Sequence, residues 1–532
     1  SSLFLVPLVP YVLLVLDRPL SIRWWLVYGA AFVLGLLPNL HLLLSAPKRN
    51  SWGDTTSWTG FVRHFLRQEY GMLQLSPQAN AETETMVERT SEYLSEMLAT
   101  GMGPPPILGA AVALIGAIAM FSARSRLVLS PARALLAALV FYLVVFHSLA
   151  NLPLSKPMPR EVHRRFWIQP HLVVCVAFGA GVHRVRSVLP RWQWCTVLLA
   201  YLSMTYSGRI RQAHDTNSTT VGSYADALLS SLPQNALLVS HTDINLNAVR
   251  YKQECEGARP DVTHLSVQLI PYPWFRERQQ SAFFSHISFP PIFRNASTDR
   301  QSEANSQIVV GLALANLPRR RVFLDIHSLN DGLIGDFNSY PGGVHLVPYG
   351  LLWEVVPPRP ELFADSGLAA WREQSRATLD DSITMLQLSP HPELGSWEFA
   401  VSCLRWDAEY QRELFLLATA LKRPGTAFAM AALNESAMRL TDLVATVQES
   451  KTVSFPFADV ARNAALATTR WLSALEKLKS QEATAQLRPE AVRAARIALS
   501  AYSALARKDD PARSKFLAVL EALSPEPAGS SV

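Results

Sequence analysis

The chain divides into two parts of different hydrophobicity. Residues 1–206 contain several apolar runs close to the length of roughly 17–25 residues that a helix needs to cross a lipid bilayer. Residues 207–532 have the mixed composition of a water-soluble domain. The mean hydropathy of +0.12 is therefore an average over two unlike parts. This division predicts chemistry at a membrane surface, with a lipid-linked or membrane-delivered reactant.

The apolar runs predict a multi-spanning α-helical membrane domain with about six spans. Charge-free stretches such as 35–44 and 107–121 argue against buried helices of a soluble core. Tryptophans at the ends of several runs are typical of an interfacial aromatic belt. The expected spans are residues 3–16, 24–44, 105–121, 134–149, 166–182 and 192–206. Gly179 and Gly181 lie within the fifth span, where we expect close helix packing rather than a phosphate loop.

Basic residues in short loops predict the orientation of these spans. Arginines between the first and second, third and fourth, and fifth and sixth spans place those loops in the cytosol. The loops 46–104 and 150–165 and the C-terminal part then face the outside or a lumen. The loop 150–165 is an exception to the charge rule, since it holds Lys156, Arg160, Arg164 and Arg165. We therefore expect this loop to have a function.

Glycosylation and cysteine patterns agree with a luminal C-terminal part. Its three Asn-x-Ser/Thr sequons are at Asn217, Asn295 and Asn434, and the rest of the chain has none. Of the four cysteines, Cys255 and Cys403 fall in this part, and they could pair in an oxidising compartment or remain buried free thiols. So few cysteines exclude a disulfide framework.

The first section of the C-terminal part, residues 207–358, is predicted to be an α/β module. A strand at 236–240, a helix at 247–256 and a strand at 262–269 form a βαβ pattern with parallel strands. Asp243 follows the first strand, where α/β folds place ligand-binding residues, although a helix N-cap is the alternative role.

Residues 359–523 are predicted to be all-helical. Apolar residues recur at three- and four-residue spacing over several long segments, as in a stack of helical repeats that binds partners or braces a neighbouring domain. The tail, residues 524–532, is rich in Pro, Ser and Gly and is expected to be disordered.

Several classes of chemistry have no motif here. The chain has no Cys-x-x-Cys, no His-Glu-x-x-His and no P-loop, so the sequence predicts neither a metal site nor a nucleotide cofactor. The net charge of +6 comes from dispersed basic residues, which does not indicate nucleic-acid binding.

The segment 51–71 predicts an amphipathic helix in the membrane interface. It follows the motif Trp52-Gly53-Asp54, and Asp54 or Thr55 is expected to cap it. Arg63 and Arg67 are four residues apart and share a polar face. They either contact lipid headgroups or hold the phosphate of a lipid-linked donor, and Asp54 could instead be an acceptor or metal ligand.

The segment 151–169 places basic side chains at the start of the fifth span. Arginine has a planar fork of donors that matches phosphate oxygens. Arg165, beside Phe166 and Trp167, is the best candidate for contact with a lipid-linked phosphate, with Arg164 next to it. Anchoring at the membrane interface is the alternative.

Several motifs in order resemble the transmembrane protein 260 family, over residue 1 to at least residue 360. They are Gly-Leu-Leu-Pro38, Trp-Gly-Asp54, Phe-x-x-His-x-x-Arg-x-x-Tyr-Gly71, Asn-Leu-x-Leu-Ser-Lys-Pro157, Arg-Phe-Trp-x-Gln169 and Cys-Glu-Gly-Ala-Arg-Pro-Asp261. The resemblance implies a GT-C type protein O-mannosyltransferase of the endoplasmic reticulum membrane. Its members transfer mannose from dolichyl phosphate mannose to Ser or Thr of folded secretory or receptor proteins, and carry luminal helical repeats.

The resemblance also implies a mechanism. An acidic residue in the first luminal loop would deprotonate the acceptor hydroxyl, and basic side chains would stabilise the departing dolichyl phosphate. The Gly-Asp-Ser-Gly-Glu stretch of that loop has no counterpart in this chain. We therefore expect an N-terminally incomplete member, whose catalytic base lies upstream of Ser1.

Two other classes of function stay open at this point. A non-catalytic membrane scaffold would bind client proteins through its luminal domain. A transporter of lipid-linked sugars is less compatible with the large C-terminal part and with the lack of paired inverted repeats.

Overall fold

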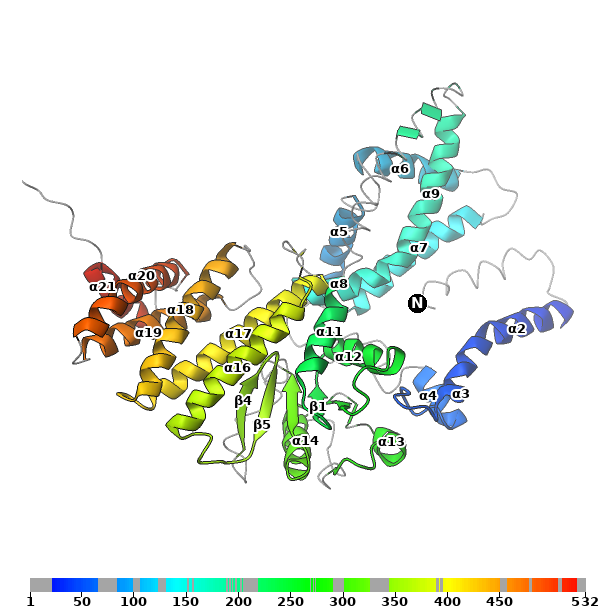
Figure 1. Ribbon diagram of the computed structural model, residues 1–532. Coiled ribbons are helices and arrows are strands. Elements are labelled where there is room, and N and C mark those ends of the chain that lie inside the picture. The colour runs from blue at the N-terminus through cyan, green and yellow to red at the C-terminus, as the bar shows by residue number, and fades with distance from the viewer. Residues whose placement is uncertain are drawn as a thin grey trace, which may run out of the picture. The chain divides into compact units, whose positions relative to one another are not determined.

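The structure is a computed structural model of residues 1–532 (Figure 1). It describes residues 22–65, 84–98, 106–122, 131–150, 153–155, 157–187, isolated positions between 190 and 203, and residues 219–267, 269–270, 272, 274–289, 301–325, 344–388, 392, 396–449, 457–477, 481–505 and 510–523. The chain forms two compact units, Ser1–Asn217 and Ser218–Val532. Each unit is described by itself.

The prediction of about six membrane spans is wrong. Within the described residues, two helices are long and apolar enough to cross a membrane, Ala132–Leu149 and Val162–Arg186. The expected first span and most of the sixth fall outside the described residues. The second expected span is divided into three short elements, and the helix in the third has 17 residues, fewer than either of the two helices above.

The helices in the second and third expected spans are shorter than the hydrocarbon core of a bilayer is thick. The helix α2 (Ile22–Leu36) has 15 residues and is about 22 Å long, against a hydrocarbon core of about 30 Å. It gives way to the 3₁₀ turn η2 (Leu37–Leu40) because Pro38 has no amide hydrogen to continue the α-helical ladder. The short helix α3 (His41–Ser45) follows. The helix α6 (Pro106–Ser122) has 17 residues, about 26 Å.

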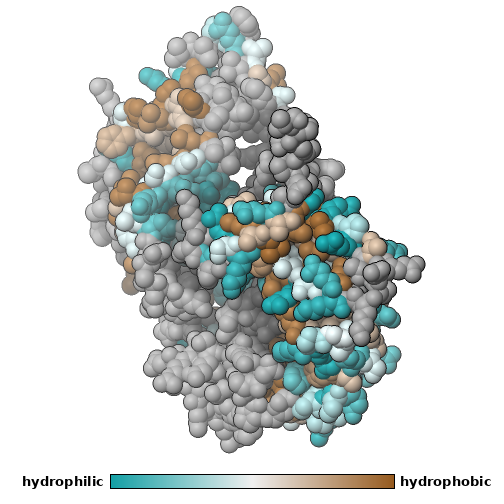
Figure 2. Space-filling model, turned by 90° about the vertical axis from the view of Figure 1, so that its left-hand side faces the viewer, coloured by the Kyte–Doolittle hydropathy of each residue, from teal (hydrophilic) through white to brown (hydrophobic). Residues whose placement is uncertain are grey.

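The remaining helices of the first unit are α4 (Trp58–Phe65), α5 (Met86–Glu96), α7 (Pro131–Leu149), α8 (Pro157–Arg164), the 3₁₀ turn η5 (Arg165–Trp167) and α9 (Ile168–Arg186). Large apolar side chains stay exposed on several of them, such as Ile107, Val140 and Leu172. Figure 2 shows hydrophobic residues, in brown, at the surface of the protein.

Helices α6 and α9 pack at very short distance through glycine. A Cβ on Gly116 would lie 1.7 Å from the carbonyl oxygen of Ala177, and a Cβ on Gly181 would lie 1.9 Å from that of Val112. The predicted close packing is thus confirmed at Gly181. Gly179 has no atom within 4 Å of its Cβ position and takes no part in it.

The second unit begins with α11 (Thr220–Ser231) and a mixed sheet of order β2-β1-β3-β5-β4. The predicted βαβ unit is confirmed: β1 (Leu237–Ser240) and β2 (Thr263–Ser266) are parallel and joined by α12 (Asp243–Cys255). The strands continue with β3 (Val322–Asp325), β4 (His345–Tyr349) and β5 (Leu352–Val356), which are joined to the first pair through η6 (Phe275–Gln280), α13 (Ser281–Phe283) and α14 (Gln301–Asn316).

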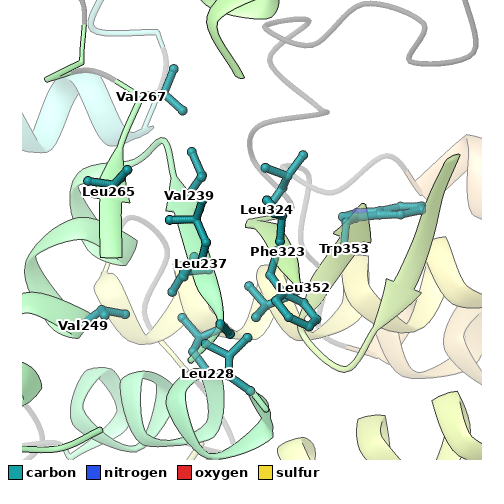
Figure 3. Close-up of a cluster of buried hydrophobic side chains, with 14 of the residues drawn as sticks. Leu228, Leu237, Val239, Val249, Leu265, Val267, Phe323, Leu324, Leu352 and Trp353 are labelled. Atoms are coloured by element: carbon teal, nitrogen blue, oxygen red, sulfur yellow. The ribbon is translucent and has the colours of Figure 1, made fainter. Parts of the chain in front are cut away.

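The sheet is not wholly parallel. Strand β3 pairs in parallel with β1, whereas β5 pairs antiparallel with both β3 and β4. Gly350 has a φ of +55° in the tight turn between β4 and β5, a conformation that glycine adopts without strain. Figure 3 shows how Leu237, Val239 and Phe323 from the central strands pack with Leu228 of α11 into a buried core.

The rest of the second unit is helical, as expected from the apolar spacing. Each helix from α17 onward packs on the next one in the chain, and α16 and α17 also pack against β4. Trp471 is fully buried in the second core, which these helices share. The helices are α16 (Asp365–Met385), α17 (Trp397–Leu421), α18 (Ala427–Glu449), α19 (Phe457–Glu476), α20 (Gln481–Leu505) and α21 (Pro511–Leu523).

Candidate functional site

The first unit brings together two segments that are distant in the sequence, helices α5 and α8. Helix α5 comes from the loop 46–104 and starts with a capping box, in which Glu88 accepts from the Thr85 amide at 2.7 Å while Thr85 Oγ1 accepts from the Glu88 amide at 3.3 Å. Helix α8 comes from the loop 150–165 and starts at Pro157, a residue that suits the first helical position.

Ion pairs join these two helices. Arg160 pairs with Glu92 and lies 3.7 Å from Glu96, and Arg164 pairs with Glu96. The Ser155 amide also donates to Glu84 Oε1 at 2.9 Å. Arg164, one of the predicted phosphate ligands, therefore holds α8 against α5.

A cluster of buried polar side chains lies at this junction. It consists of Arg89 and Tyr93 from α5, His147 from α7, His163 from α8 and Trp167 from η5, each at most 1% exposed. We call these five residues the buried polar cluster. The ring centroids of His147 and His163 are 5.7 Å apart, and those of Tyr93 and Trp167 are 5.6 Å apart.

Every member of the cluster has a polar atom without a hydrogen-bond partner in the described part of the chain. The atoms are Arg89 Nη1, Tyr93 OH, His147 Nε2, both ring nitrogens of His163 and Trp167 Nε1. Leaving one buried polar group unpaired costs about 1–3 kcal/mol, and folded proteins contain few such groups. So many in one place make the cluster a candidate ligand-binding site.

Two residues of α5, Tyr93 and Arg89, act as hydrogen-bond donors, and Glu84 just before the helix is an acceptor. Burial raises the pKa of Tyr93, so its phenol keeps its proton. Burial lowers the pKa of Arg89, which nevertheless donates to the Glu84 carbonyl at 3.1 Å and pairs with its carboxylate at 3.3 Å. Burial raises the pKa of Glu84, but hydrogen bonds from backbone amides outweigh it and the net shift is downward.

His147 offers the cluster an acceptor. The Thr90 hydroxyl donates to the Met86 carbonyl at 2.8 Å, so its oxygen lone pair faces His147 Nδ1 at 2.9 Å. This pattern assigns the proton of the neutral imidazole to Nδ1 and leaves a lone pair on Nε2. A neutral His163 ring would add one donor and one acceptor, and the Tyr93 oxygen can also accept, so the cluster presents both donors and acceptors.

Arg165, the main predicted phosphate ligand, lies on η5 with an exposed side chain. Trp167, two residues further along, belongs to the cluster, whereas the Arg165 side chain faces solvent. Arg63 is exposed on α4, and Arg67 lies outside the described residues.

The loop before α4 differs from the prediction. Ser57, not Asp54 or Thr55, caps the helix, since its Oγ accepts from the Gly60 amide at 2.9 Å. Asp54 instead accepts from the Thr56 hydroxyl at 3.3 Å. Gly53 has a φ of +82°, and a Cβ there would lie 2.2 Å from His64 Nδ1, while Trp52 is exposed.

The predicted modification sites lie in the second unit or outside the described residues. Asn434 is half-buried on α18, and Asn217 and Asn295 are among the residues that the structure does not describe. Cys255 is exposed and Cys403 half-buried, and both are free thiols, so the structure does not contain the disulfide that the sequence left open.

Asp243 is the first residue of α12, whose N-cap is Thr242, so Asp243 is not itself the cap. Among the residues that the structure describes, no three His, Cys, Asp or Glu side chains group closely enough to hold a metal ion.

The sequence prediction missed the buried polar cluster, although a signal exists. Arg89 and Tyr93 are four residues apart, as are His163 and Trp167, so each pair shares one helix face. Those faces also carry ionisable or hydrogen-bonding groups beside apolar spans.

Comparison with known proteins gives two informative matches. The chain is 26% identical over 490 residues to protein O-mannosyl-transferase TMEM260 of Mus musculus, covering 88% of this chain and 65% of the mouse protein. It is 30% identical over 287 residues to protein O-mannosyl-transferase tmem260 of Dictyostelium discoideum, covering 48% of this chain and 34% of that protein. The chain thus spans less than two thirds of either relative.

No family model matches the chain, and no solved structure matches it. The match to the mouse protein covers so much of the chain that it must include parts of both compact units. The predicted resemblance is confirmed by these matches, which make the chain a homologue of the TMEM260 proteins.

Proposed function

We propose that this chain carries part of the machinery of a protein O-mannosyltransferase in the endoplasmic reticulum membrane, with the second unit in the lumen. Its reaction would move mannose from dolichyl phosphate mannose to Ser or Thr hydroxyls of folded secretory or receptor proteins. The names of both relatives support the transferase over the scaffold. Two helices long and apolar enough to cross a membrane agree with a lipid-linked donor.

The observation that carries the proposal is the buried polar cluster. In the reaction, a bond forms between the acceptor oxygen and the anomeric carbon as the bond from that carbon to the phosphate oxygen breaks. Negative charge then grows on the departing dolichyl phosphate. Donors fixed in a water-poor site stabilise such charge more than water does. The unpaired groups of Arg89, Tyr93 and Trp167 are donors of this kind.

The proposal assigns different tasks to the arginines. The side chains of Arg160 and Arg164 keep α5 and α8 together through Glu92 and Glu96, which maintains the cluster. Arg165 is exposed and suits contact with headgroups or with the outer part of the donor. We assign the catalytic base to none of these residues.

The test uses the native protein in microsomal membranes. Transfer of labelled mannose from dolichyl phosphate mannose to a folded receptor domain is measured for Trp167→Phe and for Arg165→Gln. We expect Trp167→Phe, which removes the indole N–H but keeps an aromatic ring, to lower the transfer rate by about 10- to 100-fold. Arg165→Gln should change the rate less.

A second readout separates binding from chemistry. Dolichyl phosphate should compete with the donor in the unmodified protein and compete less well in Trp167→Phe. Unchanged transfer and unchanged competition in Trp167→Phe would remove the cluster from the donor site, and the absence of any mannose transfer by the unmodified protein would refute the proposed function itself.

A further inference from the structure

The α/β module has a topological switch point. The chain leaves the central strand β1, crosses through α12 to β2 on one side, and later enters β3 on the other side of β1. All three strands are parallel, so their carboxyl ends lie at one edge of the sheet. Ligands of α/β sheets bind at this edge, where the strand order reverses.

Three polar residues form a row across this edge. Ser266, Ser240 and Asp325 are the last residues of β2, β1 and β3. Ser240 pairs in register with Ser266, and the Val239–Leu324 register puts Ser240 beside Asp325. In-register neighbours of a sheet point to the same face. All three are at most 2% exposed, at a position where α/β cores are usually apolar.

The acidic end of the row is fixed to the start of α12. Asp325 Oδ2 accepts from the His241 amide at 2.8 Å and from Asn245 Nδ2 at 2.5 Å. Asn245 Oδ1 in turn accepts from the Tyr224 hydroxyl at 2.8 Å. A carboxylate therefore already occupies the positive end of this helix, and a bound phosphate would be repelled by it.

The other end of the row has a hydroxyl without a partner. Ser240 Oγ contacts His264 Nε2 at 2.7 Å, but the buried Ser266 Oγ has no hydrogen-bond partner within the described residues. At the Asp325 end, Thr242 Oγ1 at the N-cap of α12 also lacks a partner there. Buried hydroxyls of this kind are usually satisfied by a ligand or by ordered water.

We propose that the row Ser266–Ser240–Asp325 binds the hydroxyl groups of a neutral sugar ring. A carboxylate accepts hydrogen bonds from sugar hydroxyls, and serine hydroxyls both donate and accept. The row itself holds no cationic side chain that would select an anion. The row lies in the second unit, and its proposed role does not rest on the transferase reaction.

The test measures binding to the full chain in detergent. Methyl glycosides of mannose, glucose, galactose and N-acetylglucosamine are titrated, and binding is followed by calorimetry and by saturation-transfer NMR. We expect at least one glycoside to bind saturably. Ser266→Ala should weaken that binding about tenfold without lowering the thermal stability, because the serine hydroxyl has no protein partner to lose.

The matched control is Ser402→Ala. Ser402 is also buried, but it lies on α17 and donates to the Glu398 carbonyl of its own helix. This variant should keep glycoside binding unchanged. Asp325→Asn supplies a second probe of the row. The proposal is overturned if no glycoside binds, if binding survives in both Ser266→Ala and Asp325→Asn, or if inorganic phosphate displaces the glycoside.

Discussion

Two buried tyrosines of the first unit allow a direct test of the buried polar cluster. Tyr93 and Tyr142 are each 1% exposed and both lie near the α5–α7–α9 packing. Tyr93 OH has no partner among the described residues, whereas Tyr142 OH donates to the Phe166 carbonyl at 2.6 Å. A Tyr→Phe change removes one oxygen and keeps the ring. The two variants therefore differ mainly in whether the hydroxyl that they lose had a hydrogen-bond partner.

The two changes should have opposite effects on stability. Tyr93→Phe removes an unpaired buried hydroxyl, so the free energy of unfolding of the ligand-free protein should rise by about 1–2 kcal/mol. Tyr142→Phe breaks a hydrogen bond and leaves the Phe166 carbonyl unpaired, so unfolding should become about 1–2 kcal/mol easier.

Their effects on mannose transfer should be reversed. If Tyr93 donates to the departing phosphate, losing a hydrogen bond to a charged group of about 1.5–3 kcal/mol lowers the rate by about 10- to 100-fold. Tyr142→Phe should keep close to the full rate at a temperature where it stays folded. Stability is read from thermal unfolding in detergent, and activity from labelled mannose transfer in membranes.

One result would contradict the proposed role of Tyr93. If Tyr93→Phe lowers stability and leaves transfer unchanged, then its hydroxyl has a structural partner and the cluster is not a donor site. If Tyr142→Phe lowers mannose transfer as much as Tyr93→Phe does, both changes act through folding alone.

Three further outcomes follow from local geometry. Gly116→Ala should destabilise the α6–α9 pair by about 2 kcal/mol because its Cβ has no space, whereas Gly179→Ala should be neutral, as thermal unfolding would show. Ser57→Ala should destabilise α4 by about 1 kcal/mol through loss of its N-cap, seen as faster local hydrogen exchange. The hydrogen bond from Arg259 lowers the pKa of Asp261 to about 2, so this carboxylate stabilises the fold above about pH 4 and stops doing so as the pH falls toward 2. When it is titrated with acid, the Asp261→Asn variant should therefore lack this part of the loss of stability.

The α/β module could be predicted because its signals are local. The apolar run before Ser240, the helix that ends at Cys255 and the second strand each occupy a few consecutive residues. A βαβ unit brings neighbouring segments together, so the sequence order also gives the pairing. The antiparallel position of β5 between β3 and β4 had no such local signal.

The membrane part was predicted less well for physical reasons. Hydropathy continues across Pro38, but the α-helical hydrogen-bond ladder does not, so one expected span became three short elements. The buried polar cluster was missed because it depends on tertiary packing. His147 and Arg89 are far apart in the sequence, and neither shows its burial until α5 lies against α7.

The ion pairs at the α5–α8 junction predict how phosphate binding depends on ionic strength. From the sequence, the basic residues of the loop 150–165 were candidates either for holding a phosphate by charge or for anchoring at the membrane interface. In the structure, Arg160 and Arg164 are paired with acidic residues of α5, and Arg89 is paired with Glu84. Recognition at the cluster would then rest on oriented donors in a buried site more than on net charge.

Such binding responds weakly to salt. Ions screen exposed charges beyond about 10 Å at 0.1 M and about 3 Å at 1 M salt, but they screen buried groups much less. Competition by dolichyl phosphate should therefore change by less than about threefold between these salt concentrations. A steep fall would show that exposed arginines such as Arg165 dominate the contact, and Arg165→Gln should then abolish the salt dependence. If competition is independent of salt in the unmodified protein and is lost in Trp167→Phe, the phosphate lies among the buried donors.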